Sequence, residues 1–257
     1  NQIRRCLISR FLFSLPIPTI FCQNFRMRKL TATLCLTIAV LLGSVGVSES
    51  ADFQKGLNAA RNGDFATALR EWKPLAEQGH AVAQYNLGQM YRQGIGVPKN
   101  DKTAMKWYKL AAEQGYANAQ FNLGLTYYKG QGVPQDYKTA VKWYRLAAEQ
   151  GDASAQNNLG QMYRLGQGVP QNDKTAVKWY RLAAEQGYAN AQYNLGVMYE
   201  KGRGVSQNDK TAVKWYRLAA EQGYATAQNG LGLMYHEGKG VSQNDKTAVK
   251  WWKLAAE

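Results

Sequence analysis

The chain has 257 residues, of which 32 are Lys or Arg and 18 are Asp or Glu, so its formal net charge is +14. A hydrophobic share of 45% excludes a chain that is disordered throughout, and this length can supply a sizeable hydrophobic core. Only two His and three Cys are present, which leaves few residues for a metal or thiol site.

The first fifty residues differ in character from the rest. Met27, Arg28 and Lys29 form a short basic end, which is followed by an apolar run over 30–47 and by small polar residues before Ala51. This layout is typical of a secretory signal, so we expect 27–50 to be a signal peptide cleaved near Ala51. The alternative is a membrane anchor formed by 30–47, a run at the low edge of the length that spans a bilayer. We interpret 1–26 as upstream sequence or a misassigned start, without structure of its own.

Cleavage at Ala51 changes the composition. All three Cys lie before the cut, and 26 basic and 17 acidic residues remain after it, a net charge of +9. An exported domain without Cys must be held together by its hydrophobic core alone. The expected location is therefore the periplasm or the cell exterior, or the membrane if 30–47 stays attached as an anchor.

Residues 51–80 predict two short helices. Phe53, Gly56 and Ala60 share one helix, Asn62-Gly63 marks a tight turn, and Asp64 caps a second helix that ends at Gly79. Trp72 belongs to that second helix. We interpret 51–80 as a degenerate N-terminal capping repeat of the array that follows, because an end unit is expected to be short and atypical.

The remainder, 81–257, repeats every 36 residues. The clearest columns are a Gly at the junction before each unit and a Trp within each unit. The Gly residues are Gly79, Gly115, Gly151, Gly187 and Gly223, and the Trp residues are Trp107, Trp143, Trp179, Trp215 and Trp251. A fixed period of this length indicates a solenoid of stacked supersecondary units. Five units fit into 81–257.

Each unit predicts a first helix, a loop and a second helix. In the third unit the first helix ends at Gly166, Gly168-Val169-Pro170 forms the loop, and Asn172 caps a second helix that runs to about Gln186. The capping column reads Asn100, Asp136, Asn172, Asn208 and Asn244. With the first pair, these units predict an all-α solenoid of about twelve helices.

The packing inside a unit follows from its small and large residues. Gly160 on the first helix and Ala176 on the second remove bulk where two helices must approach closely. We expect Trp179, Tyr180 and Ala183 to point inward, with Trp179 filling the space between units.

The repeated string resembles the Sel-1-like repeat, a relative of the tetratricopeptide repeat. The columns that carry the resemblance are Ala-x-Ala-Gln-x-Asn-Leu-Gly-x-Met-Tyr-x-x-Gly-x-Gly-Val and the later Leu-Ala-Ala-Glu-Gln-Gly. The resemblance implies a right-handed α/α superhelix that serves as a scaffold for protein–protein contacts, often in bacterial envelopes. Cysteine-rich relatives have been linked to binding or hydrolysing penicillin-like drugs, but 51–257 holds no Cys, so neither that activity nor a cell-wall hydrolase is expected.

The sequence offers little for catalysis. Ser-x-x-Lys, Gly-x-Ser-x-Gly, His-Glu-x-x-His and Cys-x-x-Cys are all missing from it. His80 and His236 occupy different columns of the repeat, which argues against a shared metal or catalytic role. The Gly-x-Gly pairs follow helices, so we interpret them as caps and turns and not as phosphate loops. We expect no enzyme activity, no cofactor and no metal.

A binding surface is predicted on the first helices, where the residues vary between units. By resemblance to tetratricopeptide domains, this face lines a concave groove, in which Asn can hold the backbone amides of a protein or peptide ligand. Exposed aromatic residues beside an Asn column are typical of an interaction surface. The candidate groove residues are Tyr85, Asn86, Gln89, Phe121, Asn122, Asn158, Tyr193 and Asn194. The alternative is that the Asn column only solvates the groove.

A basic stripe is predicted on the second helices, where Lys and Arg recur at i, i+4 and i+7. We expect Glu149, Glu185 and Glu221, four residues after each Arg, to neutralise it in part. The stripe is either a solvated outer face or an attachment site for an anionic envelope surface of lipid or polysaccharide; nucleic acid is not an expected partner. Its candidate residues are Lys142, Arg145, Lys178, Arg181, Lys214 and Arg217.

Overall fold

The computed structural model describes residues 50–256. All regular structure in this range is helical, with twelve helices and no strand. Residues 50–61 form the first helix. The others are α2 (Phe65–Glu77), α3 (Ala81–Gln93), α4 (Asp101–Glu113), α5 (Ala117–Lys129), α6 (Tyr137–Glu149), α7 (Ala153–Leu165), α8 (Asp173–Glu185), α9 (Ala189–Lys201), α10 (Asp209–Glu221), α11 (Ala225–Glu237) and α12 (Asp245–Ala256). The predicted all-α array is confirmed.

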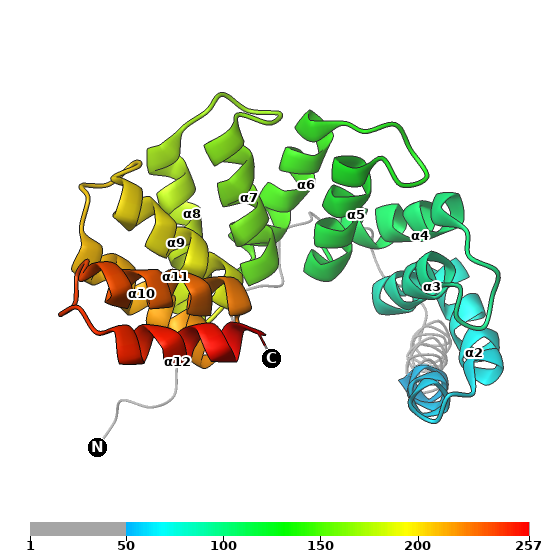
Figure 1. The fold of residues 1–257 in the computed structure, drawn as a ribbon. Coiled ribbons are helices and arrows are strands. Elements are labelled where there is room, and N and C mark those ends of the chain that lie inside the picture. The colour runs from blue at the N-terminus through cyan, green and yellow to red at the C-terminus, as the bar shows by residue number, and fades with distance from the viewer. Residues whose placement is uncertain (1–49, 257) are drawn as a thin grey trace, which may run out of the picture. The chain divides into compact units, whose positions relative to one another are not determined.

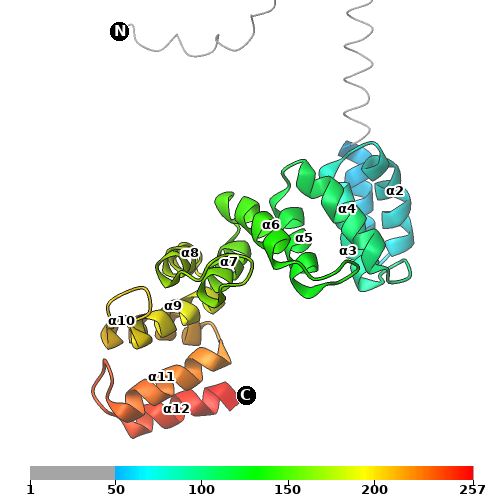
Figure 2. The same ribbon diagram turned by 90° about the horizontal axis from the view of Figure 1, so that it is seen from above.

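The helices stack in chain order as an α/α solenoid, which can be followed from α2 to α12 in Figures 1 and 2. The first helices of the units are α3, α5, α7, α9 and α11, and the second helices are α4, α6, α8, α10 and α12. Each first helix packs most extensively against the second helix of its own unit and also contacts the second helix before it. One unit therefore buries its apolar surface against its neighbours, as expected for a repeat protein.

Helix capping follows the prediction from the sequence. Asn172 Oδ1 accepts from the backbone N–H of Thr175 at 2.9 Å, and the equivalent bond exists in the other four units. Gly166 ends α7 in the left-handed region, with φ of 67°. Because only Gly adopts that conformation without strain, the Gly that recurs at the position of Gly166 determines where each first helix ends.

The aromatic core differs from the expectation in one respect. Tyr180 is fully buried, whereas Trp179 is half-buried at the edge of the cluster formed by α6 and α7. Tyr180 fits against Gly160, where an added Cβ would lie 2.8 Å from the ring and 3.2 Å from the Ala176 carbonyl oxygen. The predicted close approach at Gly160 and Ala176 is thus confirmed, but it accommodates Tyr180, while Trp179 covers the outside of the joint between units.

The first and last described helix pairs use Trp in the place of this Tyr. Trp72 packs on Gly56 and Trp252 packs on Gly232 in the same manner as Tyr180 on Gly160. The larger ring carries an N–H that donates to a carbonyl oxygen of the opposing helix, from Trp72 to Phe53 at 3.3 Å. Trp72 and Trp252 thus occupy the column that holds Tyr108, Tyr144, Tyr180 and Tyr216 in the other units.

A buried Gln column ties successive units together. Gln156 Nε2 donates to the Ala148 carbonyl oxygen at 3.1 Å, and its Oε1 accepts from Gln186 at 2.8 Å. The same pair of bonds is made around Gln84, Gln120 and Gln192. Each bond brings a second donor to a carbonyl oxygen at the end of the preceding second helix, as at Ala148, which also accepts from the backbone N–H of Gly151 at 3.0 Å.

The second Gly of each Gly-x-Gly pair makes a contact between units. Gly168, with φ of 71°, lies directly on the backbone of Tyr137 and Lys138 at the start of α6, in the preceding unit. An added Cβ would overlap the Tyr137 carbonyl group. The interpretation of these pairs as caps and turns is therefore correct for the first Gly and incomplete for the second.

The expected leader lies almost entirely outside the described residues. Residues 1–26, the three Cys and 27–49 of the expected signal peptide are not described, while Ser50 and Ala51 belong to the helix over 50–61. Between residues 50 and 256, no helix is both long and apolar enough to cross a membrane.

Candidate binding surface

The predicted groove residues all lie on first helices, and we call the surface that they share the binding face. It comprises Tyr85, Asn86 and Gln89 of α3, Phe121 and Asn122 of α5, Asn158 of α7, and Tyr193 and Asn194 of α9. Side chains bridge neighbouring first helices along this face. Arg92 of α3 donates to Asn122 Oδ1 of α5 at 3.3 Å, and Asn194 of α9 donates to Asn157 Oδ1 of α7 at 2.9 Å.

The three aromatic residues of the binding face are half-buried, so the expectation that they are exposed is wrong. Each ring packs against the buried Tyr of the second helix in its own unit. The ring centroids lie 6.0 Å apart for Tyr85 and Tyr108, 5.9 Å for Phe121 and Tyr144, and 5.6 Å for Tyr193 and Tyr216. The residue at this position varies between units, but it is still part of the packing. Tyr85, Phe121 and Tyr193 each cover the buried Tyr of their own unit.

The Asn column is largely engaged inside the array. Asn122 is buried and donates to the Asn118 carbonyl oxygen at 2.8 Å, in addition to accepting from Arg92. Asn194 donates to Asn157, and Asn157 donates to Asn158 at 3.3 Å. Asn86 differs from the others, because its side chain is half-buried and makes no hydrogen bond to any described residue.

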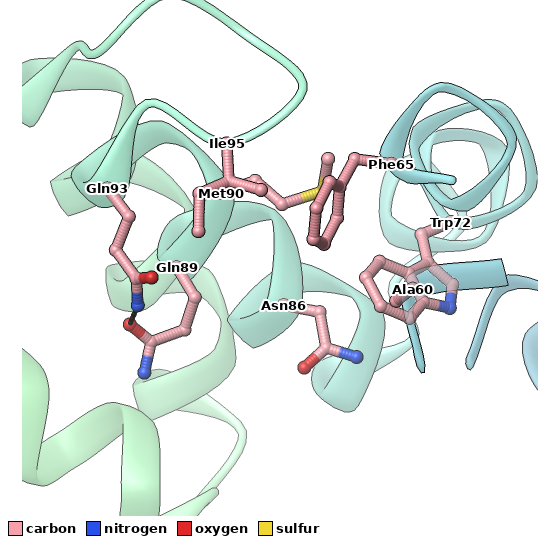
Figure 3. Close-up of a pocket in the computed structure, with 8 residues that line it drawn as sticks. All are labelled: Ala60, Phe65, Trp72, Asn86, Gln89, Met90, Gln93 and Ile95. Carbon is pink, nitrogen blue, oxygen red and sulfur yellow. Dashed lines mark hydrogen bonds between the residues drawn. The ribbon is translucent and has the colours of Figure 1, made fainter. Parts of the chain in front are cut away.

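Asn86 lies at a hollow between α3 and the first helix pair, which Figure 3 shows in close-up. We call it the α3 hollow. Its volume is about 160 Å³, smaller than the roughly 300–1,000 Å³ of pockets that enclose small-molecule ligands. The lining residues are Ala60, Phe65, Trp72, Asn86, Gln89, Met90, Gln93 and Ile95. The size and the mostly apolar lining suit a single apolar side chain.

Gln89 forms a fixed polar edge beside this hollow. Its Oε1 accepts from the Tyr108 hydroxyl at 2.9 Å, and its Nε2 donates to the Tyr85 hydroxyl at 2.6 Å. Gln93 donates to the same Oε1 at 3.4 Å, the dashed line in Figure 3. Gln89 is therefore held by three partners, whereas Asn86 makes no side-chain hydrogen bond to a described residue and is available for a ligand. The sequence did not single out Asn86 from its column, because its bonding depends on its neighbours in space.

The buried Tyr hydroxyls beneath the binding face have unequal partners. The Tyr216 hydroxyl donates to Glu200 Oε2 at 2.5 Å, and burial, followed by this carboxylate, raises the pKa of Tyr216 far above its usual range. The Tyr180 hydroxyl is buried without a hydrogen bond among the described residues. Burial raises the pKa of Tyr180 as well, and the nearby Arg164 opposes that rise.

We expect Tyr216→Phe and Tyr180→Phe to differ in stability although they remove the same atom. Tyr216→Phe should lower the free energy of unfolding by about 1.5–3 kcal/mol, because it removes a hydrogen bond to a charged acceptor. Tyr180→Phe should be neutral or slightly stabilising, because its hydroxyl has no partner to lose. Urea unfolding of both variants measures the difference, and equal losses would contradict the assigned bonding.

The basic stripe lies on the second helices as predicted. Lys142, Lys178, Lys214, Arg145 and Arg217 are exposed, and Arg181 is half-buried. Lys142 and Lys214 also lie over the neighbouring Trp143 and Trp215 rings, at 5.4 and 5.8 Å from the centroids.

The expected neutralisation by Glu149, Glu185 and Glu221 is wrong for the part of the chain that is described, where none of the three forms an ion pair. Instead each Arg reaches the next unit and donates to a Tyr hydroxyl there. The bonds are Arg145 to Tyr163 and Arg181 to Tyr199, both at 2.9 Å, and Arg217 to Tyr235 at 2.8 Å. A neutral phenol leaves the positive charge of the stripe intact.

The two His residues take separate structural positions. His80 caps α3, with its Nδ1 accepting from the backbone N–H of Ala83 at 3.1 Å, and its ring stacks on Phe53. His236 contacts Asp245 at 2.7 Å near the other end. Over residues 50–256, no group of three or more His, Cys, Asp or Glu is placed to hold a metal ion.

Comparisons with known proteins agree on one family. The Sel1 repeat model matches residues 81–116, 117–152, 153–188, 189–224 and 225–257. A comparison with curated proteins finds no match to this chain.

Several solved structures are similar. A Sel1 repeat protein from Oxalobacter formigenes is 38% identical, with a TM-score of 0.76 over 80% of this chain and 82% of that one. A protective antigen of uropathogenic Escherichia coli with an SLR fold is 37% identical, with a TM-score of 0.78 over 84% of this chain and 48% of the antigen. The chain thus spans about half the length of the antigen. An immunity protein from Pseudomonas aeruginosa, 22% identical with a TM-score of 0.50 over 81% of each chain, shares the fold.

Proposed function

Because the chain belongs to the Sel1 repeat family, whose members are generally scaffolds for protein–protein contacts, we propose that it is an exported, non-catalytic scaffold that binds a protein or peptide through its binding face. The signal-like pattern over 27–50 supports export. The groove that the family resemblance implies is the expected place of the partner.

The observation that carries the proposal is the combination of Asn86 with the α3 hollow. Phe65, Trp72, Met90 and Ile95 offer an apolar socket, and Asn86 offers an amide with both a donor and an acceptor beside it. A peptide in extended conformation presents the complementary groups: an apolar side chain that can enter the socket, and a neighbouring backbone amide that can pair with Asn86. The bound segment is therefore one with an apolar anchor residue, and Asn86 pairs with its backbone.

This proposal predicts a selective effect of Asn86→Ala. Peptides selected on the full chain from a phage-displayed library should bind the Asn86→Ala variant about 5- to 30-fold more weakly, since a paired amide contributes about 1–2 kcal/mol. Asn86 has no internal hydrogen bond to lose, so the fold should be unaffected. Isothermal titration calorimetry with the selected peptides measures the change.

Gln171→Ala is the matched control, because Gln171 is an exposed amide in the loop between α7 and α8. It should leave the peptide Kd unchanged. A Kd that is the same for Asn86→Ala and wild type would remove the α3 hollow from the binding site. Alanine at Tyr85, Phe121 and Tyr193 is a poorer test, since those rings pack on buried Tyr residues and their loss would disturb the array itself.

A further inference from the structure

The second helices expose a row of Leu beside the basic stripe. Each of these Leu directly follows the last cation of the stripe in its unit, and each is between 36% and 46% exposed. The row consists of Leu110, Leu146, Leu182, Leu218 and Leu254. Large apolar side chains at equivalent exposed positions in all five units form a feature that core packing does not require.

The cations next to these Leu are held in a shared orientation. Arg145, Arg181 and Arg217 each donate one bond to a Tyr hydroxyl of the next unit, which fixes the guanidinium and leaves its other N–H groups available. Around α10 the two kinds of side chain border one cavity of about 330 Å³, where Lys210, Lys214 and Arg217 meet Val213, Leu218 and Val241. The surface therefore offers positive charge and apolar contact at the same place.

The pattern of identity between units indicates the kind of partner. Outside the Asn column, binding-face positions differ from unit to unit, as a partner with a defined sequence requires. By contrast, Lys178, Arg181 and Leu182 have the same counterparts in the units on either side. Identical contacts in successive units suit a partner with the same chemistry along its whole extent. A cation reaches a lipid headgroup phosphate, and an adjacent Leu reaches the boundary of the acyl region. A soluble polyanion would use the cations but not the Leu row.

We propose that the second-helix face, with its basic stripe and its Leu row, docks on an anionic phospholipid surface. This leaves the binding face on the first helices for a protein partner. The two surfaces lie on different helices of each unit.

Photo-crosslinking in the full chain tests which face meets the lipid. p-Benzoylphenylalanine replaces Leu182 of α8 in one protein and Leu165 of α7 in another, positions that are 46% and 43% exposed. Each protein is irradiated with vesicles of phosphatidylcholine alone or with about a third phosphatidylglycerol, and lipid adducts are quantified by mass spectrometry. We expect adducts at position 182 with phosphatidylglycerol at low salt, several-fold more than at 165, and their loss at high salt. Comparing two positions within one chain separates this contact from any anchoring by 30–47.

A charge-reversed pair supplies the second measurement. Lys178→Glu with Lys214→Glu should reduce the adduct yield at position 182 roughly a hundredfold, because each basic residue near an anionic surface contributes about 1 kcal/mol and each reversal adds repulsion. Lys99→Glu with Lys129→Glu makes the same change in net charge at exposed sites off the second helices and should have little effect. Circular dichroism checks that both variants are folded.

Three results would overturn the proposal. Equal adduct yields at positions 182 and 165 would mean that the second-helix face has no preference for lipid. Adducts at 182 that need no phosphatidylglycerol, or that fall equally with the control pair, would mean that the stripe is not responsible. Binding of a soluble acidic oligosaccharide that depends on Lys178 and Lys214, with no lipid adduct, would reassign the face to a polymer.

Discussion

Tyr180→Ala should lower the free energy of unfolding by about 3–5 kcal/mol, the loss typical of removing a large aromatic side chain from a closed core. Tyr180 is fully buried between Gly160 of α7 and the cluster formed by α8 and α9. The opposing Gly cannot fill the space left behind, so a cavity remains. Because the third unit is central, its loss should also weaken the stacking of the units on both sides.

Urea unfolding followed by circular dichroism measures this effect, with Trp179→Ala as the comparison. Trp179 is larger but only half-buried, so its removal should cost less than the removal of Tyr180. A greater loss for Trp179→Ala would mean that the Trp column, and not the Tyr column, closes the joint between units.

Gly168→Ala should lower the free energy of unfolding by about 2–5 kcal/mol. A non-Gly residue at its positive φ of 71° costs about 1–2 kcal/mol, and overpacking typically adds about 1–3 kcal/mol. The added methyl would overlap the Tyr137 carbonyl group and lie 2.8 Å from the Lys138 nitrogen. Both obstacles are backbone atoms of the preceding unit, so they cannot rotate away.

Gly187→Ala is the matched control for Gly168→Ala. Gly187 also has a positive φ, of 88°, but an added Cβ would meet nothing within 4 Å. Its replacement should cost only the conformational part, about 1–2 kcal/mol. The difference between the two variants, measured by urea unfolding, isolates the contact between units; equal losses would show that this contact contributes nothing.

The 36-residue period made most of the fold predictable. Asn172 and Gly166 predict helix boundaries because they cap helix ends. Capping depends only on a few residues that are close in sequence, so it can be predicted from the sequence. Gly160 predicts a close contact between two helices because it has no side chain. The repeat pattern did not predict which aromatic side chain packs against Gly160. Trp179 and Tyr180 are adjacent in sequence, and which of them is buried depends on the angle between the helices.

The candidate site was less predictable, because its contacts join residues in different units. The candidate residues lie on the first helices as predicted, yet Asn122 and Asn194 are engaged by Arg92 and Asn157, more than 25 positions away. Periodicity gives the face of a helix but not the distance to the next helix. The availability of Asn86 and the bond from Arg181 to Tyr199 follow from that distance.

Hydrogen exchange on the full chain, with and without a selected peptide, tests the central claim that the binding face receives the partner. The account predicts that the peptide slows backbone exchange in α3 and α2, around Asn86 and the α3 hollow, and that the second helices α6, α8 and α10 are unchanged. Slowed exchange confined to those second helices, with α3 unaffected, would contradict it.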